Sequence, residues 1–230
     1  MKAIAILNTV LKRLWLASPF SSKKVSDRID KAVWFGRFSR WSKQHECLVS
    51  NWRPAIYEDL CKSELNNEPI TYLEFGTHQG RSMRWWLSLC PNPDSRFVGF
   101  DTFEGLPEAW EGLSQGHFST KGKTPDIKDP RCSFVAGLFQ QTLPEFLRTY
   151  KPAGRQIIHV DADLFSSALF VLNQIGPITQ AGDIYIFDEF HVWMDEFRAF
   201  QLFLCAFPFR YKVLFRSPDW SQVAIKITET

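Results

Sequence analysis

After residue 69 the chain alternates between short apolar runs and segments with helical spacing, and this alternation constrains the fold more than any other feature. The apolar runs, which we interpret as strands, cover residues 70–75, 96–101, 133–136, 156–161, 183–188, 211–216 and 222–227. Helical patterns cover residues 82–89, 143–150, 166–175 and 194–207. Apolar strands separated by helices are typical of a parallel sheet with helices on both faces. The sequence therefore predicts an α/β fold with seven strands.

Two connections in this region stand out. The last two predicted strands are separated only by residues 217–220, which is short enough for a hairpin, so one edge of the sheet is expected to be antiparallel. Residues 105–131 are rich in Gly, Lys, Pro and Asp and form one long loop. A loop of that length inside a compact domain is usually a lid or a binding loop.

The first 68 residues have a different character. They carry helical patterns and no strand-like run, and the turn signal Asn66-Asn67-Glu68-Pro69 follows them. We therefore expect an N-terminal helical extension over residues 1–68 and an α/β domain over residues 69–230.

The charge of the chain is distributed unevenly along it. Residues 1–45 hold 10 Lys or Arg against 2 Asp or Glu, and the remainder holds 17 against 23. A basic arm could meet an anionic lipid surface or nucleic acid, but a solvated helix face is the interpretation we favour. The mildly acidic body disfavours a nucleic-acid partner.

The extreme N-terminus has apolar residues at helical spacing. They are Ile4, Leu7, Leu11 and Leu14. The spacing predicts an amphipathic helix that docks on the domain or on a second subunit, so a homo-oligomer could form through the N-terminal helices. No apolar run approaches the ~20 residues that a transmembrane helix needs.

The cysteine pattern bears on the compartment. Five widely spaced cysteines occur, and none forms a C-x-x-C motif. This argues against a disulfide framework and against a zinc site, and it favours reduced thiols in a cytoplasmic protein.

Acidic residues follow four of the first five predicted strands. Glu74 lies near the end of the first strand and Asp101 ends the second, while Asp161 and Asp188 end the fourth and fifth. Ligands of open parallel sheets bind beyond the C-terminal ends of the strands. Because clustered carboxylates are costly unless they meet hydroxyls, an amine or a cation, this pattern predicts a binding site.

The turn after the first strand supports such a site. Its glycines, Gly76 and Gly80, are spaced as G-x-x-x-G, which is neither the dinucleotide fingerprint nor a P-loop. Glu74 beside the turn suits a ligand with a positive amine better than a pyrophosphate. Asp101 lies where an acid accepts hydrogen bonds from ribose hydroxyls.

Five ordered motifs resemble those of class I S-adenosylmethionine-dependent methyltransferases, and most closely the macrocin/mycinamicin-type sugar O-methyltransferases. The motifs are EFGTHQGRS (74–82), GFDTFEGLPE (99–108), GLFQQTLPEF (137–146), HVDADLFSS (159–167) and IFDEF (186–190). The resemblance covers about residues 70–200. It implies a Rossmann-like sheet of seven mostly parallel strands with one antiparallel edge strand.

The resemblance also implies roles for individual residues. The residues expected to bind S-adenosylmethionine are Glu74, Gly76, Thr77, Gly80, Ser82, Asp101, Thr102, Phe103, Gly137 and Leu138. Asp161, Asp188 and Glu189 match the magnesium-binding acids of the family, although the last of these is usually Asp. Ala168 is a second departure, because the family commonly has Thr there.

The chemistry of these residues agrees with the resemblance. Oxygen-rich acids suit Mg²⁺, and a cation that chelates a vicinal diol lowers the pKa of the hydroxyl. Asp161 or His191 could accept the hydroxyl proton. We therefore expect an S-adenosylmethionine-dependent O-methyltransferase, assisted by Mg²⁺, that acts on a hydroxyl of a sugar or other polyol-bearing small molecule.

Two alternatives stay open. One is metal-independent methyl transfer to oxygen or nitrogen, and the other is an inactive module that binds the cofactor and a partner. A nicotinamide oxidoreductase is disfavoured because the glycine spacing is wrong for it.

Overall fold

The computed structural model describes residues 22–51 and 53–230. The expectation of an amphipathic helix near residues 1–16 lies outside this range. The chain divides into two compact units between Gln44 and His45. In the first unit the described residues form helix α2 (Lys23–Gln44), in which the Arg37 guanidinium lies 4.5 Å from the centre of the Trp34 ring.

The second unit is built on one eight-stranded sheet. Its strands are β1 (Leu48–Val49), β2 (Ile70–Phe75), β3 (Arg96–Asp101), β4 (Cys132–Ala136), β5 (Arg155–Val160), β6 (Ile184–Phe187), β7 (Arg210–Arg216) and β8 (Val223–Glu229). Their order across the sheet is β1-β7-β8-β6-β5-β2-β3-β4. All neighbouring strands are parallel except β8, which is antiparallel to both β6 and β7.

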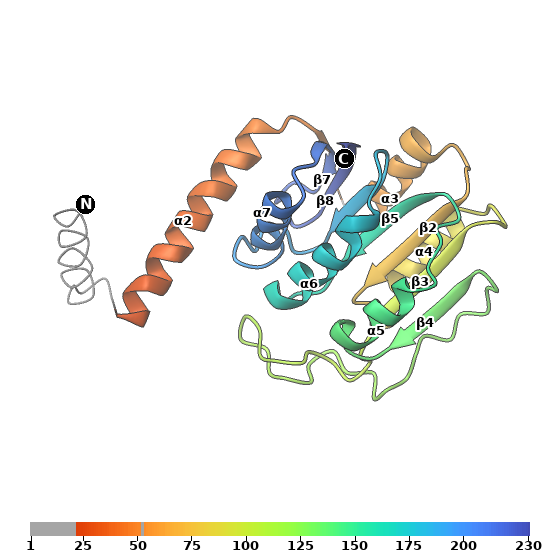
Figure 1. Ribbon diagram of the computed structural model, residues 1–230, viewed down its shortest axis with the longest axis horizontal. Helices are drawn as coiled ribbons and strands as arrows, with labels where there is room; N and C mark the ends of the chain where they lie inside the picture. The colour runs from red at the N-terminus through yellow and green to blue at the C-terminus, as the bar shows by residue number, and fades with distance from the viewer. Residues whose placement is uncertain (1–21, 52) are drawn as a thin grey trace, which may run out of the picture. The chain divides into compact units, whose positions relative to one another are not determined.

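Helices cover both faces of this sheet (Figure 1). The main helices are α3 (Arg53–Leu60), α4 (Arg81–Leu89), α5 (Phe139–Leu147), α6 (Phe165–Ile175) and α7 (Glu196–Ala206), with the π-helical segment η2 (Cys61–Leu65) after α3 and the 3₁₀ segment η3 (Gly176–Ile178) after α6. Helices α5, α6 and α7 pack side by side on one face, and α3 and α4 pack together on the other. The predicted Rossmann-like α/β fold is confirmed.

Two details of the sheet differ from the prediction. An eighth strand, β1, pairs with the end of β7, and its two residues are too few to give a recognisable pattern. The antiparallel strand lies inside the sheet instead of at its edge. Val223, Ala224 and Ile225 of β8 are fully buried, and pairing with both β6 and β7 removes their backbone from water.

The segment before β2 packs as part of the sheet unit, although the turn near Glu68 predicts a boundary there. Ile56, Tyr57 and Leu60 of α3 are fully buried in the core that covers one face of the sheet. The ring of Tyr57 lies 5.3 Å from that of Trp86 on α4. This packing fixes α3 beside the C-terminal strand ends.

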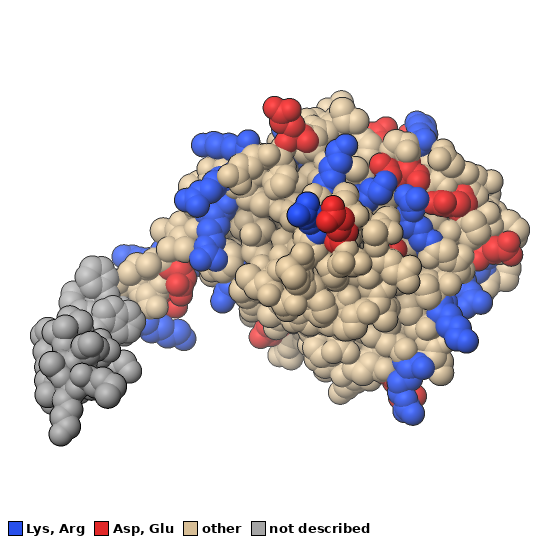
Figure 2. Space-filling view, turned by 45° about the horizontal axis from the view of Figure 1, so that its top comes forward, with Lys and Arg blue, Asp and Glu red and all other residues tan. Residues whose placement is uncertain are grey.

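The visible surface carries charges of both signs. On the sheet unit, Lys and Arg side chains alternate with Asp and Glu in Figure 2. Within residues 22–51 and 53–230, no helix has the length and apolar character that crossing a membrane requires. All five cysteines are free thiols.

Candidate active site

The site lies where the order of the strands reverses. The chain runs from β2 outward to β3 and β4, then crosses back to β5 and β6 on the other side of β2. A cavity of about 290 Å³ opens there, beyond the C-terminal strand ends. It is lined by Arg53, Gly76, His78, Asp101, Thr102, Gly105, Leu106, Pro107, Trp110, Phe118, Leu138, Phe139, Gln140, Asp161, Ala162, Asp163, Ser167, Asp188 and Glu189. This is the position at which open α/β sheets bind ligands.

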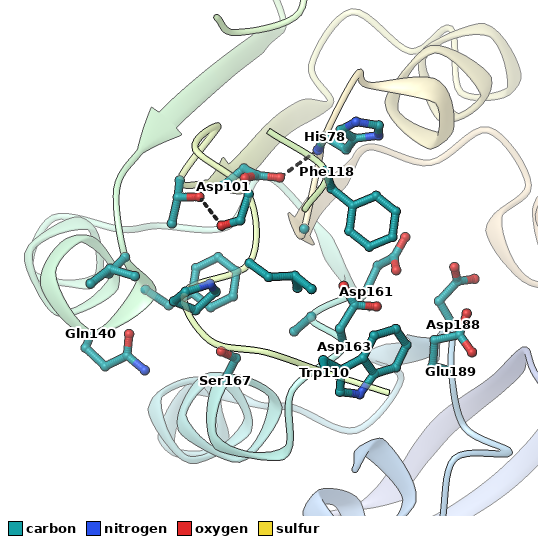
Figure 3. A pocket seen from close by; sticks show the side chains of 18 of the residues that line it. His78, Asp101, Trp110, Phe118, Gln140, Asp161, Asp163, Ser167, Asp188 and Glu189 are labelled. Atoms are coloured by element: carbon teal, nitrogen blue, oxygen red, sulfur yellow. Dashed lines mark hydrogen bonds between the residues drawn. The ribbon is translucent and has the colours of Figure 1, made fainter. Parts of the chain in front are cut away.

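Asp101, the last residue of β3, forms one side of the cavity (Figure 3). Its Oδ2 accepts the backbone N–H of His78 at 2.7 Å, and its Oδ1 accepts that of Phe103, also at 2.7 Å. These two bonds join the loops after β2 and β3 and fix the direction of the carboxylate. Each oxygen keeps a further lone pair that can accept a ligand hydroxyl.

The turn after β2 brings two strand ends very close together. Gly76 has a φ of +102°, and a β-carbon there would overlap the backbone carbonyl of Asp161. The N–H of Asp161 in turn bonds to the carbonyl of Phe75 at 2.9 Å. Only glycine therefore fits this position, for a reason that lies in strand packing as well as in ligand approach.

The acidic side of the cavity is formed by Asp161, which follows β5, and by Asp188 and Glu189, which follow β6. Figure 3 shows these acids across the cavity from Asp101. The guanidinium of Arg53 contacts two of them. Its Nη1 lies 3.4 Å from Asp161 Oδ2, and its Nη2 contacts Asp188 Oδ2.

Burial and the neighbouring acids raise the pKa values of the carboxyl groups at this end. Burial raises the pKa of Asp161 to about 6, and the charges of Glu189 and Asp101 add to the rise, while Arg53 opposes it. Burial, with the charge of Asp161 next in importance, raises the pKa of Asp163 to about 7. Perturbed carboxyl groups in a cavity are typical of functional sites.

Glu196, the first residue of α7, holds this acidic end in place. Its carboxylate is fully buried and accepts the backbone N–H of Asp188 and of Glu189, both at 3.0 Å, and that of Ala162 at 3.3 Å. One side chain therefore joins the loops that follow β5 and β6. Burial raises the pKa of Glu196 well above its ordinary value, and three N–H donors stabilise its charged form.

The loop between β3 and β4 covers the cavity. Its backbone is closed by two bonds between Leu106 and the segment that carries His117, and Trp110 and Phe118 reach the cavity wall. The indole N–H of Trp110 donates to Asp195 Oδ2 at 2.9 Å, just before α7. The predicted lid segment is thus attached to the far side of the site.

The structure separates the predicted cofactor residues into two groups. Gly76, Asp101, Thr102 and Leu138 line the cavity. The residues outside the cavity wall are Glu74, Thr77, Gly80, Ser82, Phe103 and Gly137. Of the predicted metal and catalytic residues, Asp161, Asp188 and Glu189 line the cavity, whereas His191 does not.

The outlying residues mostly support the wall. The Phe103 side chain is buried against Phe134, and only its backbone N–H reaches Asp101. Gly80 caps the N-terminus of α4 beneath Pro125, and the N–H of Gly137 bonds to the carbonyl of Asp101 at 2.9 Å.

Three of the outlying residues belong to a buried polar layer below the glycine turn. Glu74, Thr77 and Ser82 are all buried. The Tyr72 hydroxyl lies 3.0 Å from Glu74 Oε1 and 2.6 Å from His159 Nδ1. Burial is the main cause that raises the pKa of Glu74 to about 8.

His191, the second candidate base, lies on the surface side of the acids. Its side chain is 43% exposed, and its Nδ1 is 3.6 Å from Glu189 Oε2. It is close enough to interact with the Glu189 carboxylate, but of the two candidate bases only Asp161 lines the cavity.

A second cleft adjoins the acidic end. It shares Arg53, Asp188 and Glu189 with the cavity. Its other lining residues are Asn51, Ser217, Pro218, Asp219, Ser221 and Gln222. Eight of its nine lining residues are polar or charged, and Gln222 donates from its amide to Asp188 Oδ1.

Sequence reasoning missed several residues of the site. Arg53 stands in the segment predicted as the helical extension, and Trp110 stands just beyond the motif GFDTFEGLPE, which ends at residue 108. Glu196 lies in the first turn of a helix, where acidic residues are common, so its type and position do not mark it as a site residue. Asp163 is the cavity residue that the sequence could have indicated, because it follows Asp161 at a spacing of two in the motif VDAD.

The comparisons with known proteins assign the family. The methyltransferase domain family matches residues 73–190, just over half of the chain. The chain therefore belongs to the methyltransferase family, and its Rossmann-like fold is that of a class I S-adenosylmethionine-dependent enzyme. A search of curated protein sequences gives no match.

Solved structures agree on the fold. The O-methyltransferase NovP superimposes with a TM-score of 0.61 at 20% identity, covering 76% of this chain and 79% of NovP. Calicheamicin methyltransferase CalS11 superimposes with a TM-score of 0.59 at 21% identity, covering 95% of this chain and 90% of CalS11. A second, apo structure of CalS11, a TDP-rhamnose 3'-O-methyltransferase, gives a TM-score of 0.54 at 22% identity over 74% of this chain and 77% of that one.

Proposed function

We propose that this methyltransferase transfers the methyl group of S-adenosylmethionine to a hydroxyl of a sugar or another polyol-bearing small molecule. The observation that carries the proposal is a single cavity with Asp101 at one end and the acids Asp161, Asp188 and Glu189 at the other. The first end suits a nucleoside and the second suits a hydroxylated acceptor. The activity of CalS11 as a TDP-rhamnose 3'-O-methyltransferase agrees with this acceptor class.

The residues of the cofactor end fit S-adenosylmethionine. Asp101 is held by two backbone N–H groups and keeps lone pairs for the ribose hydroxyls. Leu138 and Phe139 supply apolar wall for a flat base, and Gly76 allows close approach of the backbone. When bound, the cofactor supplies an electrophilic methyl group on a sulfonium. Glu74, whose pKa is raised, would gain charge stabilisation from the nearby ammonium.

The residues of the acidic end fit a divalent cation by their chemistry. Asp161 and Asp188, together with His159, each offer a ligand atom, and these atoms lie within 4.8 Å of one another. Carboxylate oxygens are the ligands that Mg²⁺ prefers. Mg²⁺ bound by Asp161 and Asp188, with Glu189 nearby, would supply Lewis-acid activation of the acceptor hydroxyl.

In the proposed reaction, the chain's own residues orient the acceptor and take its proton. The acceptor hydroxyl would lie beside Asp161, which would accept its proton as the oxygen bonds to the methyl carbon and the carbon–sulfur bond breaks, leaving a neutral thioether. When no metal ion is bound to it, a raised pKa of about 6 makes Asp161 a stronger base than an ordinary aspartate while leaving it ionised at neutral pH. Trp110 and Phe118 exclude water over the site, so alignment of oxygen, methyl and sulfur is the main work of the protein.

The polar second cleft suits the remainder of the acceptor. Asn51, Ser217, Ser221 and Asp219 offer several hydrogen-bonding groups in a small area. A molecule with several hydroxyls could satisfy these groups, whereas a flat aromatic acceptor would leave them unpaired.

The cytoplasmic location predicted from the reduced cysteines and the homo-oligomer predicted from the N-terminal residues remain predictions.

One observation favours metal-independent transfer as the second candidate. The Arg53 guanidinium already places one positive charge against both Asp161 and Asp188 without a metal ion. Methyl transfer that survives exhaustive chelation with EDTA and dialysis would favour this alternative. Activity that is lost on chelation and restored by Mg²⁺ would favour the metal-assisted reaction.

The test of the function begins with cofactor binding. Calorimetric titration of the purified protein with S-adenosylmethionine is expected to give binding, and titration with NAD is expected to give none. Asp101→Ala should weaken S-adenosylmethionine binding by about tenfold or more, because it removes charged hydrogen-bond acceptors. Asp94→Ala, at an exposed aspartate before β3, is the matched control and should leave the affinity unchanged.

The acceptor is then sought with methyl-labelled S-adenosylmethionine and a panel of sugars, nucleotide sugars and polyols. Transfer to any member supports the proposal. Tight cofactor binding without transfer to any member would favour an inactive cofactor-binding module instead.

A further inference from the structure

Arg53 contacts two of the three residues that could hold a metal ion. It is the first residue of α3, and its guanidinium reaches across to the ends of β5 and β6. Nη1 lies 3.4 Å from Asp161 Oδ2, and Nη2 contacts Asp188 Oδ2. The guanidinium therefore stands against the same two carboxylates that the candidate metal cluster uses.

Among the residues that the structure describes, two buried atoms of the candidate metal cluster lack a hydrogen-bond partner. Asp188 is only 1% exposed; its Oδ1 receives Gln222, while its Oδ2 has no hydrogen-bond donor among the described residues apart from the Arg53 contact. His159 is fully buried, and its Nε2 has no hydrogen-bond partner in the described part of the chain. A buried carboxylate without a counter-charge is strongly destabilising. Arg53 supplies that charge when no metal ion is bound.

The cluster has room for one cation. Its three ligand atoms lie within 4.8 Å of one another, so a metal ion bound to them would be only a few ångströms from the guanidinium. Two positive charges at that separation repel each other, and most strongly near Asp188, which is buried. Ligation of a metal ion by Asp161 and Asp188 therefore requires Arg53 to move.

The Arg53 side chain borders a second cleft that could receive its guanidinium. Its side chain is 39% exposed, and it lines the second cleft as well as the cavity. The second cleft carries Asp219, an acid that can receive the guanidinium.

We propose that Arg53 is an exchangeable internal cation, which occupies the Asp161–Asp188 pair in the metal-free enzyme and competes with a divalent cation for it. This inference rests on the metal-assisted form of the proposed function. It predicts that the enzyme binds its metal more weakly than the ligands alone would allow, because only the fraction of molecules with Arg53 displaced is competent to bind.

The test measures binding of Mn²⁺, which suits carboxylate ligands as Mg²⁺ does and can be followed by electron paramagnetic resonance. The proteins are the wild type, Arg53→Ala and Arg53→Gln. Arg155→Ala is the matched control, because Arg155 also pairs with two acids, Glu64 and Glu68, but at the opposite end of β5. Arg53→Gln keeps hydrogen-bond donors without charge, and it serves if the alanine variant does not fold.

We expect Mn²⁺ to bind about tenfold or more tightly to both Arg53 variants than to the wild type, with Arg155→Ala unchanged. Mn²⁺ should also raise the melting temperature of the Arg53 variants by more than it raises that of the wild type. Equal or weaker Mn²⁺ affinity in the Arg53 variants overturns the inference, as does the absence of Mn²⁺ binding in all four proteins.

Cofactor binding separates this inference from the proposed function. S-adenosylmethionine binding together with unchanged Mn²⁺ affinity would overturn the role of Arg53 and leave the methyltransferase function standing. Tighter Mn²⁺ binding in the variants of a protein that transfers no methyl group would support the role of Arg53 and count against the proposed function.

Discussion

The backbone carbonyl of Asp161 occupies the space that a side chain on Gly76 would need. This contact joins the ends of β2 and β5 at the strand-order reversal, where the cavity opens. The glycine of the cofactor-binding turn is therefore also a packing residue, and it sets the position of a candidate catalytic acid.

Gly76→Ala tests this packing against a matched control. Gly76 has a φ of +102° and Gly182 a φ of +101°, but a β-carbon on Gly182 would meet nothing within 4 Å. Both alanine variants share the backbone strain, and only Gly76→Ala adds the overlap with Asp161. We expect Gly76→Ala to lower the free energy of unfolding by about 2 kcal/mol more than Gly182→Ala does. Thermal unfolding measures the difference, and equal losses would contradict the packing role.

Glu196→Ala should destabilise the acidic end of the site. The substitution leaves the N–H groups of Ala162 and Glu189 without their acceptor, while that of Asp188 keeps the carbonyl of Val160 at 3.2 Å. Unsatisfied buried groups cost about 1–3 kcal/mol each, so a loss of about 2 kcal/mol or more of unfolding free energy is expected. Glu145→Ala, at an exposed glutamate, should have little effect.

A Glu196→Gln variant separates positioning from folding. The amide keeps an acceptor oxygen but turns an NH₂ group toward N–H donors, so the ends of β5 and β6 should shift while the fold remains. S-adenosylmethionine affinity should stay close to that of the wild type, because Asp101 on β3 does not depend on Glu196. The KM for the acceptor should rise. A change confined to cofactor affinity would show that the role assigned to Glu196 is wrong.

Loop 105–131 is expected to open and close by means of Trp110. The indole bond to Asp195 attaches the loop to the start of α7, and Trp110→Phe removes that bond while keeping an aromatic ring. Hydrogen exchange in residues 107–115 should become faster in the variant, and exchange in α5 should not change. In the wild type, cofactor and acceptor together should slow exchange in the loop. Identical exchange with and without these ligands would argue against a lid.

Much of the fold and of the cofactor end could be predicted because their signals are local. β2 and β3 have the predicted boundaries, since each is a continuous apolar run ended by a turn. The carboxylates at the strand ends follow from the same pattern, because parallel strands end at one edge of the sheet. Helix α5 begins four residues before its predicted start, because Pro144 indicates a helix start, whereas the structure has it inside the helix.

The parts that could not be predicted depend on contacts distant in sequence. Arg53 and Asp161 are 108 positions apart, and Trp110 and Asp195 are 85 apart. No periodicity relates such residues, and only the packing of α3 and of the long loop brings them together. For the same reason, the sequence alone does not indicate that a guanidinium stands between two candidate metal ligands.

In the metal-independent form of the reaction, in which Arg53 stays against Asp161, the rate of methyl transfer should depend on pH through the acids of the cavity. Burial raises the pKa of Asp161 to about 6, and Asp161 must be ionised to accept the acceptor's proton. The rate should therefore increase about tenfold per pH unit below pH 6 and level off above it. This rise of the rate with pH is the acidic limb of the profile.

Two variants should move the acidic limb in opposite directions. Arg53→Gln removes a positive charge that lowers the pKa of Asp161, so the limb should move to higher pH. Glu189→Gln removes a negative charge that raises the pKa of Asp161, so the limb should move to lower pH. Measured kcat/KM profiles that shift in the same direction, or not at all, would mean that another group, such as His191, accepts the proton.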